Sequence, residues 1–280
     1  TDFAGGNGES ADTAYKIATA EQLMYMRNLV NDPTTNGTYA NKYYALTADI
    51  DLGGAEWEPI GYDSNRMFGG KFDGKGHVVK NFKITQTYGK FLAFFGHLNN
   101  SGVEISNLGI ENETINDTTS NSQRIAGFAA RGAGKFTNCY VKNLTVSTDY
   151  GTVGAFFHSL RAGGTFENCY VYNATITVRR GKDGVSGFVM SAENDANSTF
   201  TNCYTANVTN TRTNTYTLPF SFAWSQNKYN NDKSENKNGY VVHTINNCWS
   251  TLAHTKGTTV ATNANHDLNK YPDAVTCADT

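Results

Sequence analysis

The segment Phe136-Thr137-Asn138-Cys139-Tyr140-Val141 recurs along the chain, and this recurrence is the strongest indication of the fold. Two close copies, one weaker copy and two earlier segments share its frame, and they lie at 166–171, 200–205, 245–250, 105–110 and 79–84. The shared asparagine therefore recurs every 26 to 45 residues, at positions 81, 107, 138, 168, 202 and 247. Self-similarity at such a period is the signature of a repeat architecture.

A second apolar segment also recurs, once in each repeat. Its copies are rich in Phe and Gly and occur at 91–95, 125–128, 153–157, 185–189 and 219–222. Each repeat thus holds at least two short apolar segments, separated by clusters of Gly, Asn, Asp and Ser that are typical of turns.

Alternation within the repeat indicates strands. In the segment 136–141, successive side chains point to opposite faces of a strand, and we expect Cys139 and Val141 to face inward and Tyr140 to face outward. No helical pattern separates the strands. A repeat of about 30 residues made of strands and turns predicts an all-β, right-handed parallel β-helix (solenoid) of about seven coils. The alternative is a β-propeller, whose blades usually need 40 or more residues, and only the 45-residue step allows it.

The two ends of the chain differ from the repeats. Thr19 and Gln22 form a capping box, and an apolar face follows, which predicts one helix over 20–31. A parallel solenoid needs caps because its end coils expose strand edges. We therefore expect an N-terminal cap at 1–42, the parallel β-helix at 43–254, and a C-terminal cap or tail at 255–280.

Composition and charge exclude several classes. The chain has 280 residues with 23 Lys and Arg against 25 Asp and Glu, a net charge of −2, and no basic block. We therefore expect neither nucleic acid nor an anionic membrane surface as a partner. No run of 18 apolar residues is present, so we expect no membrane-spanning segment.

An ordered series of motifs resembles a known group. The motifs are Thr19-Ala20-Glu21-Gln22-Leu23, then the segments 44–52, 57–61 and 68–77, and then the Asn-Cys-Tyr coils. Together they cover roughly residues 3–250 and resemble GLUG-motif β-helix proteins, which are surface and secreted proteins of gut and other host-associated bacteria. The motif that names the group has a Gly-Leu core, whereas this chain has Phe at Gly127-Phe128 and Gly187-Phe188.

This resemblance implies an extracellular or cell-surface location in a bacterium. It also implies a module, which we expect to be monomeric, of a longer adhesin-like protein. The group carries no agreed catalytic residues, so none can be transferred to this chain.

Repeated aromatic residues are the first candidate binding feature. Tyr140, Tyr170, Tyr204 and Trp249 occupy one position in successive repeats. If the cysteines face inward, these side chains form an exposed stripe that packs against sugar rings or stabilises the sheet as cross-coil pairs. A long polar segment at 225–239 is a candidate cover for this stripe.

Arg131 and Arg161 are the second candidate. Each precedes its Asn-Cys-Tyr phrase by seven residues, so we expect them to stack in adjacent coils. One interpretation is a basic groove for an acidic glycan. The other is a solvated edge with Glu167, Glu193 or Asp183 as partners.

The remaining polar residues favour structural roles. We expect Cys139, Cys169, Cys203 and Cys248 to form a ladder of buried free thiols, with Cys277 as an odd thiol, because no metal-ligand spacing accompanies them. The repeated asparagine is expected to form a ladder or to cap a turn. Asp49, Asp51 and Asp73 resemble a catalytic set, but their positions are more typical of turns and strand edges. We expect no cofactor and no metal.

The sequence favours a non-catalytic surface module of the adhesin type, which presents a β-helix face to glycans or to host and matrix surface molecules. One alternative is a β-helix polysaccharide lyase or glycoside hydrolase acting on an acidic polysaccharide, with Arg131 and Arg161 beside acids such as Asp183 or Glu193. The other is a passive spacer in a larger surface protein.

Overall fold

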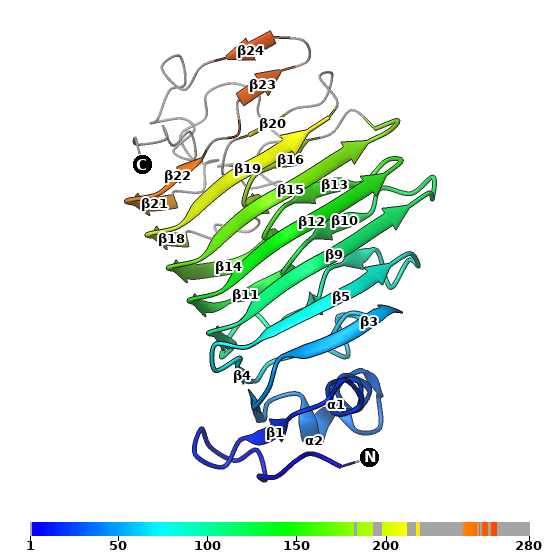
Figure 1. Cartoon of the computed structure of the whole chain (residues 1–280), viewed down its shortest axis with the longest axis vertical. Helices are drawn as coiled ribbons and strands as arrows, with labels where there is room; N and C mark the ends of the chain where they lie inside the picture. Colours follow the sequence, from blue (N-terminus) through cyan, green and yellow to red (C-terminus); the bar gives the residue numbers. More distant parts are fainter. Residues whose placement is uncertain are drawn as a thin grey trace.

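The chain winds as a parallel β-helix whose coils stack along one axis (Figure 1). The computed structural model describes residues 2–181, 184–192, 198–211, 217–218, 243–250, 252, 254–256 and 259–261. The predicted all-β parallel solenoid is confirmed. It has about six turns, slightly fewer than the seven coils expected.

Three sheets line the helix, and every pairing in the repeated part is parallel. The front sheet, which faces the viewer in Figure 1, contains β3 (Ile50–Glu56), β5 (Val78–Ile84), β9 (Gly109–Asp117), β12 (Tyr140–Thr148), β15 (Tyr170–Val178), β19 (Tyr204–Asn210) and β22 (Trp249–Ser250). The short-strand sheet contains β6 (Phe91–Leu92), β10 (Arg124–Ala126), β13 (Thr152–Gly154), β16 (Val185–Ser186), β20 (Thr217–Leu218), β23 (His254–Lys256) and β24 (Thr259–Ala261).

The third sheet closes each turn. It contains β1 (Tyr15–Ile17), β2 (Tyr43–Leu46), β4 (Lys71–Asp73), β7 (Phe95–His97), β8 (Glu104–Ser106), β11 (Ala129–Thr137), β14 (Phe157–Glu167), β17 (Val189–Ala192), β18 (Ser198–Thr201) and β21 (His243–Asn246). Its long strands β11 and β14 span two segments, since β11 pairs with β7 near its start and with β8 near its end.

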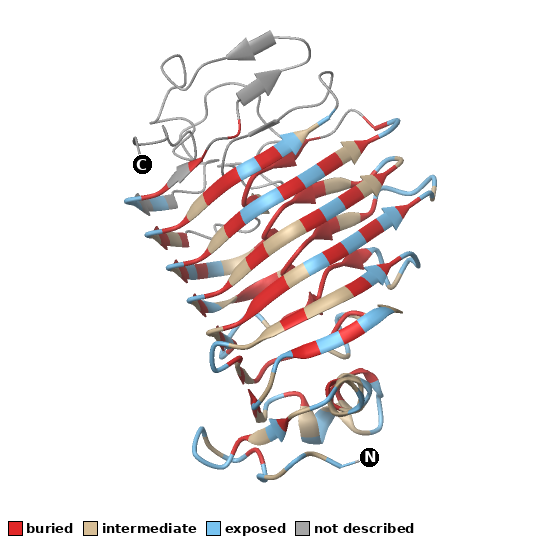
Figure 2. Cartoon of the chain, viewed as in Figure 1, coloured by how far each residue is buried: buried red, intermediate tan, exposed pale blue. Residues whose placement is uncertain are grey.

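Identical side chains stack inside the helix because the register brings each repeat over the last. Cys139, Cys169 and Cys203 have no exposed surface and are free thiols, as is the buried Cys248, so the predicted inward cysteine ladder is confirmed. A phenylalanine stack also fills the core. Its rings, Phe128, Phe156 and Phe188, are parallel within 9° and 4.6 Å apart. Figure 2 shows the resulting alternation of buried and exposed bands along the front strands.

The predicted helix at 20–31 is confirmed as α1 (Ala20–Asn31). Thr19 caps it, since its Oγ1 accepts a hydrogen bond from the Gln22 amide at 3.2 Å. Leu23, Met26 and Val30 are completely buried on the face that covers the first coil, and the four-residue α2 (Asn36–Tyr39) follows. The apolar face of α1 therefore closes the N-terminal end of the core.

Two asparagine ladders mark the corners of the coils. The Nδ2 of each asparagine donates to the Oδ1 of its neighbour in the previous coil at 2.6–3.2 Å, and every member has a positive φ of 52–62°. One ladder contains Asn107, Asn138, Asn168, Asn202 and Asn247, and the other Asn81, Asn112, Asn143, Asn173 and Asn207. Our assignment of Asn81 to the first series was therefore wrong. Both structural roles expected for the repeated asparagine, ladder and turn, occur together.

The described C-terminal part departs from the parallel pattern. Strand β23 pairs antiparallel with both β20 and β24. The segment 225–239 and Cys277 lie outside the described residues, as do the acids Asp183 and Glu193. The predicted boundaries at 42 and 254 stay predictions.

Candidate binding surfaces

The predicted tyrosine stripe lies on the outer face of the front sheet. The rings of Tyr140 and Tyr170 are 4.9 Å apart and parallel within 5°, and those of Tyr170 and Tyr204 are 4.7 Å apart and parallel within 4°. The three side chains are half-buried. Because each ring covers the face of the next, the stack presents ring edges and hydroxyl groups to the solvent.

The lower end of the stack is closed by Gly109. A Cβ atom at that position would lie 2.3 Å from Cζ of Tyr140, so the ring occupies the space that a side chain would fill. The Tyr140 hydroxyl donates to Oε1 of Glu111 at 3.1 Å. At the other end, the register places Trp249 next to Tyr204, but its side chain lies outside the described part of the structure.

The stacked phenols stay protonated. Burial raises the pKa of Tyr140, and the nearby Glu111 carboxylate raises it further. Burial also raises the pKa of Tyr170 and of Tyr204. At neutral pH the stripe is therefore an uncharged row of hydroxyl groups that can donate and accept hydrogen bonds.

The sequence patterns did not point to Tyr172, which at 43% is the most exposed aromatic side chain among the described residues of this face. It lies two residues after Tyr170 in β15 and therefore on the same outer face. Beside it runs a row of exposed threonines that pair in register, Thr114, Thr145, Thr175 and Thr209. The two-residue alternation predicts an outward Tyr172, because this residue directly follows Val171, whose side chain faces inward.

The predicted stacking of Arg131 on Arg161 is wrong. Arg131 pairs with Ser159 in the next coil and with His97 in the previous one. Strand β14 carries a bulge in which 161–163 lie opposite the single residue 133, so Arg161 is displaced from the position equivalent to Arg131.

Arg131 instead shares an aromatic ring with Arg124 at the junction of the short-strand sheet and the third sheet. Cζ of Arg131 lies 4.9 Å from the ring centroid of Phe91, and Cζ of Arg124 lies 5.1 Å from the same centroid. His97 packs against this ring with 4.5 Å between centroids. We call these four residues the arginine corner.

Two buried histidines near the arginine corner are neutral at physiological pH. Burial lowers the pKa of His97 to about 4, and the positive charge of Arg161 acts in the same direction against the opposing effect of Asp63. Burial lowers the pKa of His158 to about 3, with a further contribution from Arg124. His158 also contacts Thr152 Oγ1 at 2.7 Å and Ser159 Oγ at 2.6 Å.

The candidate catalytic carboxylates have structural roles, as the sequence favoured. Asp51 and Asp73 accept the first hydrogen bonds of the two asparagine ladders, at 3.0 and 3.1 Å. Asp49 accepts from the Val78 amide and contacts His77, each at 3.1 Å. Among the described residues, no cluster of His, Cys, Asp and Glu is suited to a metal ion.

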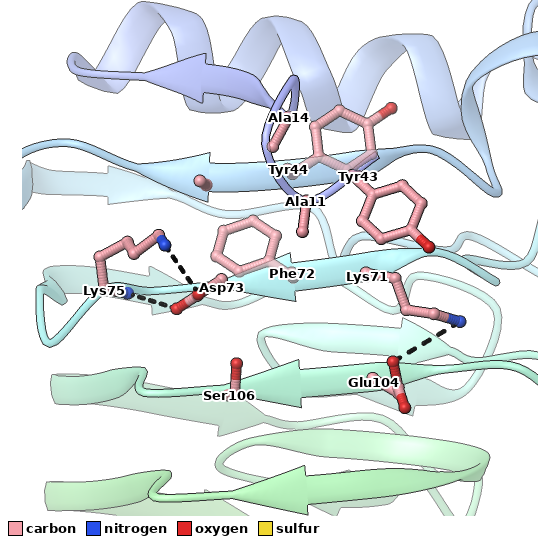
Figure 3. Close-up of a pocket in the computed structure, with 11 residues that line it drawn as sticks. Ala11, Ala14, Tyr43, Tyr44, Lys71, Phe72, Asp73, Lys75, Glu104 and Ser106 are labelled. Atoms are coloured by element: carbon pink, nitrogen blue, oxygen red, sulfur yellow. Dashed lines mark hydrogen bonds and ion pairs between the residues drawn. The ribbon is translucent and has the colours of Figure 1, made fainter. Parts of the chain in front are cut away.

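A pocket lies where the N-terminal segment crosses the first strands of the third sheet (Figure 3). Its charged side chains are already paired, with 3.9 Å between Lys71 Nζ and Glu104 Oε2 and 3.4 Å between Lys75 Nζ and Asp73 Oδ2. None of the predicted binding residues lines it. The pocket therefore offers a ligand little unpaired charge.

No helix in the described part of the chain is long and apolar enough to cross a membrane. No family model matches the chain, so membership of the GLUG-motif group stays a prediction. A segment of the chain is 34% identical over 119 residues to a "Putative Gly-rich membrane protein" of Evansella cellulosilytica, which covers 40% of this chain and 12% of that protein. A segment of 121 residues is 30% identical to "Halomucin" of Haloquadratum walsbyi, covering 39% of this chain and 1% of that protein.

A solved structure supports the fold. The crystal structure of a "putative immunoglobulin A1 protease" from Bacteroides ovatus is similar over 93% of this chain and 82% of that one, with a TM-score of 0.52. Because the sequence identity is 20%, this similarity concerns the β-helix fold alone.

Proposed function

We propose that this chain is a non-catalytic binding module of a bacterial surface protein, which presents the front sheet to glycans or to host and matrix surface molecules. The observation that carries the proposal is the in-register outer face of β9, β12, β15 and β19, where like side chains repeat from coil to coil. The names of the two sequence relatives, a membrane protein and a halomucin, support a location at the cell surface.

The chemistry of this face suits a polymer of sugars. Tyrosine hydroxyls and threonine hydroxyls recur at the spacing between coils, which is about 4.8 Å in a parallel sheet. Such a row offers many equivalent hydrogen bonds, each individually weak, to a ligand whose hydroxyl groups also repeat. Tyr172 adds an exposed aromatic ring, the kind of side chain on which the apolar face of a sugar packs.

The structure also indicates which tyrosines stabilise the sheet and which is more available to a ligand. The faces of Tyr170 are covered by Tyr140 and Tyr204 at 4.9 and 4.7 Å, so its substitution disturbs three coils at once. Tyr172 is the better probe of binding because it is exposed and shares in none of the observed ring stacks.

The test is a glycan array probed with the wild-type chain and with Tyr172→Ala. We expect a saturable signal that Tyr172→Ala weakens at least tenfold. The matched control is Tyr150→Ala, which removes a tyrosine of similar exposure, 37%, from the turn after β12. Equal binding by all three proteins would exclude the front sheet as the binding face.

A further inference from the structure

Two cationic side chains share a single aromatic ring at the arginine corner. Arg124 belongs to β10 and lies next to Phe91 of β6 in register, while Arg131 belongs to β11 and reaches the same ring from the third sheet. Each guanidinium carbon is about 5 Å from the ring centroid. The ring is 94% buried, because its exposed fraction is 6%, and it therefore fixes both arginines at this junction.

No carboxylate among the described residues compensates the charges of Arg124 and Arg131 by pairing with them. Neither Arg124 nor Arg131 forms an ion pair with a described Asp or Glu. The nearby Asp63 is engaged by Arg66, with 2.5 Å between Oδ2 and Nη2. Because both guanidinium carbons lie about 5 Å from one ring centroid, they are no more than about 10 Å apart, and an anion bound between them would reduce the repulsion of the two like charges.

His97, which packs against the same ring, is neutral and therefore does not offset the positive charge of the two arginines. His97 is 5% exposed, and its Nε2 is buried without a hydrogen-bond partner among the described residues. An anion entering the corner would meet guanidinium donors from both β10 and β11.

We propose that the arginine corner binds an oxyanion, a carboxylate or a sulfate group, carried by an acidic polysaccharide. Arginine is suited to this role because its planar fork binds both groups through two parallel hydrogen bonds. Arg124 and Arg131 are both intermediate in burial, so part of each residue is open to solvent. This site lies on other sheets than the tyrosine stripe, and it stands whether or not the front sheet binds a glycan.

A polymer fits the arrangement better than a single small ion. Arg124 on β10 and Arg131 on β11 reach Phe91 from two different sheets, so a polymer that crosses this junction can place one anionic group at each guanidinium. Two such contacts made by one chain raise its affinity through multivalency.

Equilibrium binding to four polymers tests the proposal and separates the two kinds of oxyanion. The probes are dextran sulfate, which carries only sulfate, hyaluronan, which carries only carboxylate, chondroitin sulfate, which carries both, and neutral dextran as the blank. The proteins are the wild type, Arg124→Gln, Arg131→Gln and the double variant. We expect the double variant to lose at least tenfold in affinity for the polymer that binds best, and dextran to show no binding.

Lys135→Gln is the matched control, because it removes one positive charge from an exposed position of the same strand, β11. We expect its affinity to stay within twofold of the wild type. An equal loss in Lys135→Gln and Arg131→Gln would mean that only net charge matters, and it would overturn the proposal. Failure of the wild type to bind any acidic polymer would overturn it as well.

A second measurement uses the wild-type protein and does not depend on the folding of a variant. Arginines are modified with phenylglyoxal in the presence and absence of the bound polymer, and the sites are read by mass spectrometry. We expect the polymer to protect Arg124 and Arg131 while leaving Arg27 and Arg180, which lie elsewhere, as reactive as before. Unchanged reactivity of Arg124 and Arg131 would place the anion at another site. A negative result here, together with glycan binding that depends on Tyr172, would leave the proposed function of the front sheet intact.

Discussion

Glu113 is a carboxyl group in the core of the β-helix, and its replacement tests the packing most sharply. It lies in β9 between Phe82 and Leu144, which pair with it in register from the coils on either side. Its side chain is 1% exposed, and neither carboxyl oxygen has a hydrogen-bond partner among the described residues. Burial raises the pKa of Glu113 well above its ordinary value, so the folded protein holds this group as the neutral acid.

The expected gain in the free energy of unfolding from Glu113→Leu has two parts. A buried polar group without a partner costs about 1–3 kcal/mol, and leucine removes that cost while matching Leu144 in the next coil. The second part depends on pH. Below the unfolded pKa of about 4.3, the acid is protonated in both states. Above it, only the unfolded chain ionises, and the wild type loses about 1.4 kcal/mol of stability per pH unit until the folded pKa is reached.

Urea unfolding at pH 4.0, 5.5 and 7.0, followed by tryptophan fluorescence, measures both parts. We expect Glu113→Leu to be more stable than the wild type at every pH, by a margin that grows as the pH rises. Glu113→Gln is the control, since it keeps a polar group but cannot ionise. Glu113→Gln should remove the part of the pH dependence of stability that comes from Glu113, while keeping the constant cost of a buried polar group. A lower stability of Glu113→Leu at pH 7.0, or a margin independent of pH, would refute the reasoning.

Three further predictions concern the stacked core and the corners. Phe156→Ala removes the middle ring of a stack with 4.6 Å spacing, and we expect calorimetry or urea unfolding to show a loss of about 3–5 kcal/mol. Asn143→Ala should be less stable than Asn143→Gly by about 1–2 kcal/mol in the same assay, because φ at this position is 58° and only the glycine variant adopts it without strain. Thiol titration should find the four core cysteines unreactive until the protein unfolds, and rapid labelling in the native state would contradict their burial; these are Cys139, Cys169, Cys203 and Cys248.

The fold was predictable because the repeat determines the register. Once Asn138, Asn168 and Asn202 are aligned, Cys must stack on Cys and Tyr on Tyr, and the two-residue alternation places Cys inside. The misassignment of Asn81 has a physical cause. Each coil contains two corners with left-handed asparagine, so a single repeated asparagine fits either corner when the lengths of the loops are unknown.

The candidate sites were less predictable because they depend on contacts between different sheets. The bulge in β14 lengthens one coil by two residues. Arg131 and Arg161 each precede the asparagine of their repeat by seven residues, so the sequence spacing gave no sign of this bulge. Arg124 and Arg131 both contact Phe91 from different sheets, and this contact depends on how the two sheets join, which a local sequence pattern does not indicate. The tyrosine stripe was predicted in position, but the covering of each ring face by the next follows only from side-chain geometry.

The most direct test of a non-catalytic binding module measures binding and cleavage in one sample. Purified wild-type chain is titrated with neutral and acidic polysaccharides, and the same mixtures are assayed afterwards for new reducing ends and for unsaturated products. We predict saturable binding of at least one polysaccharide with no product above the protein-free blank. Release of either product in proportion to the protein concentration would contradict the account and identify a polysaccharide lyase or hydrolase. An absence of both binding and product would also contradict it and would favour a passive spacer.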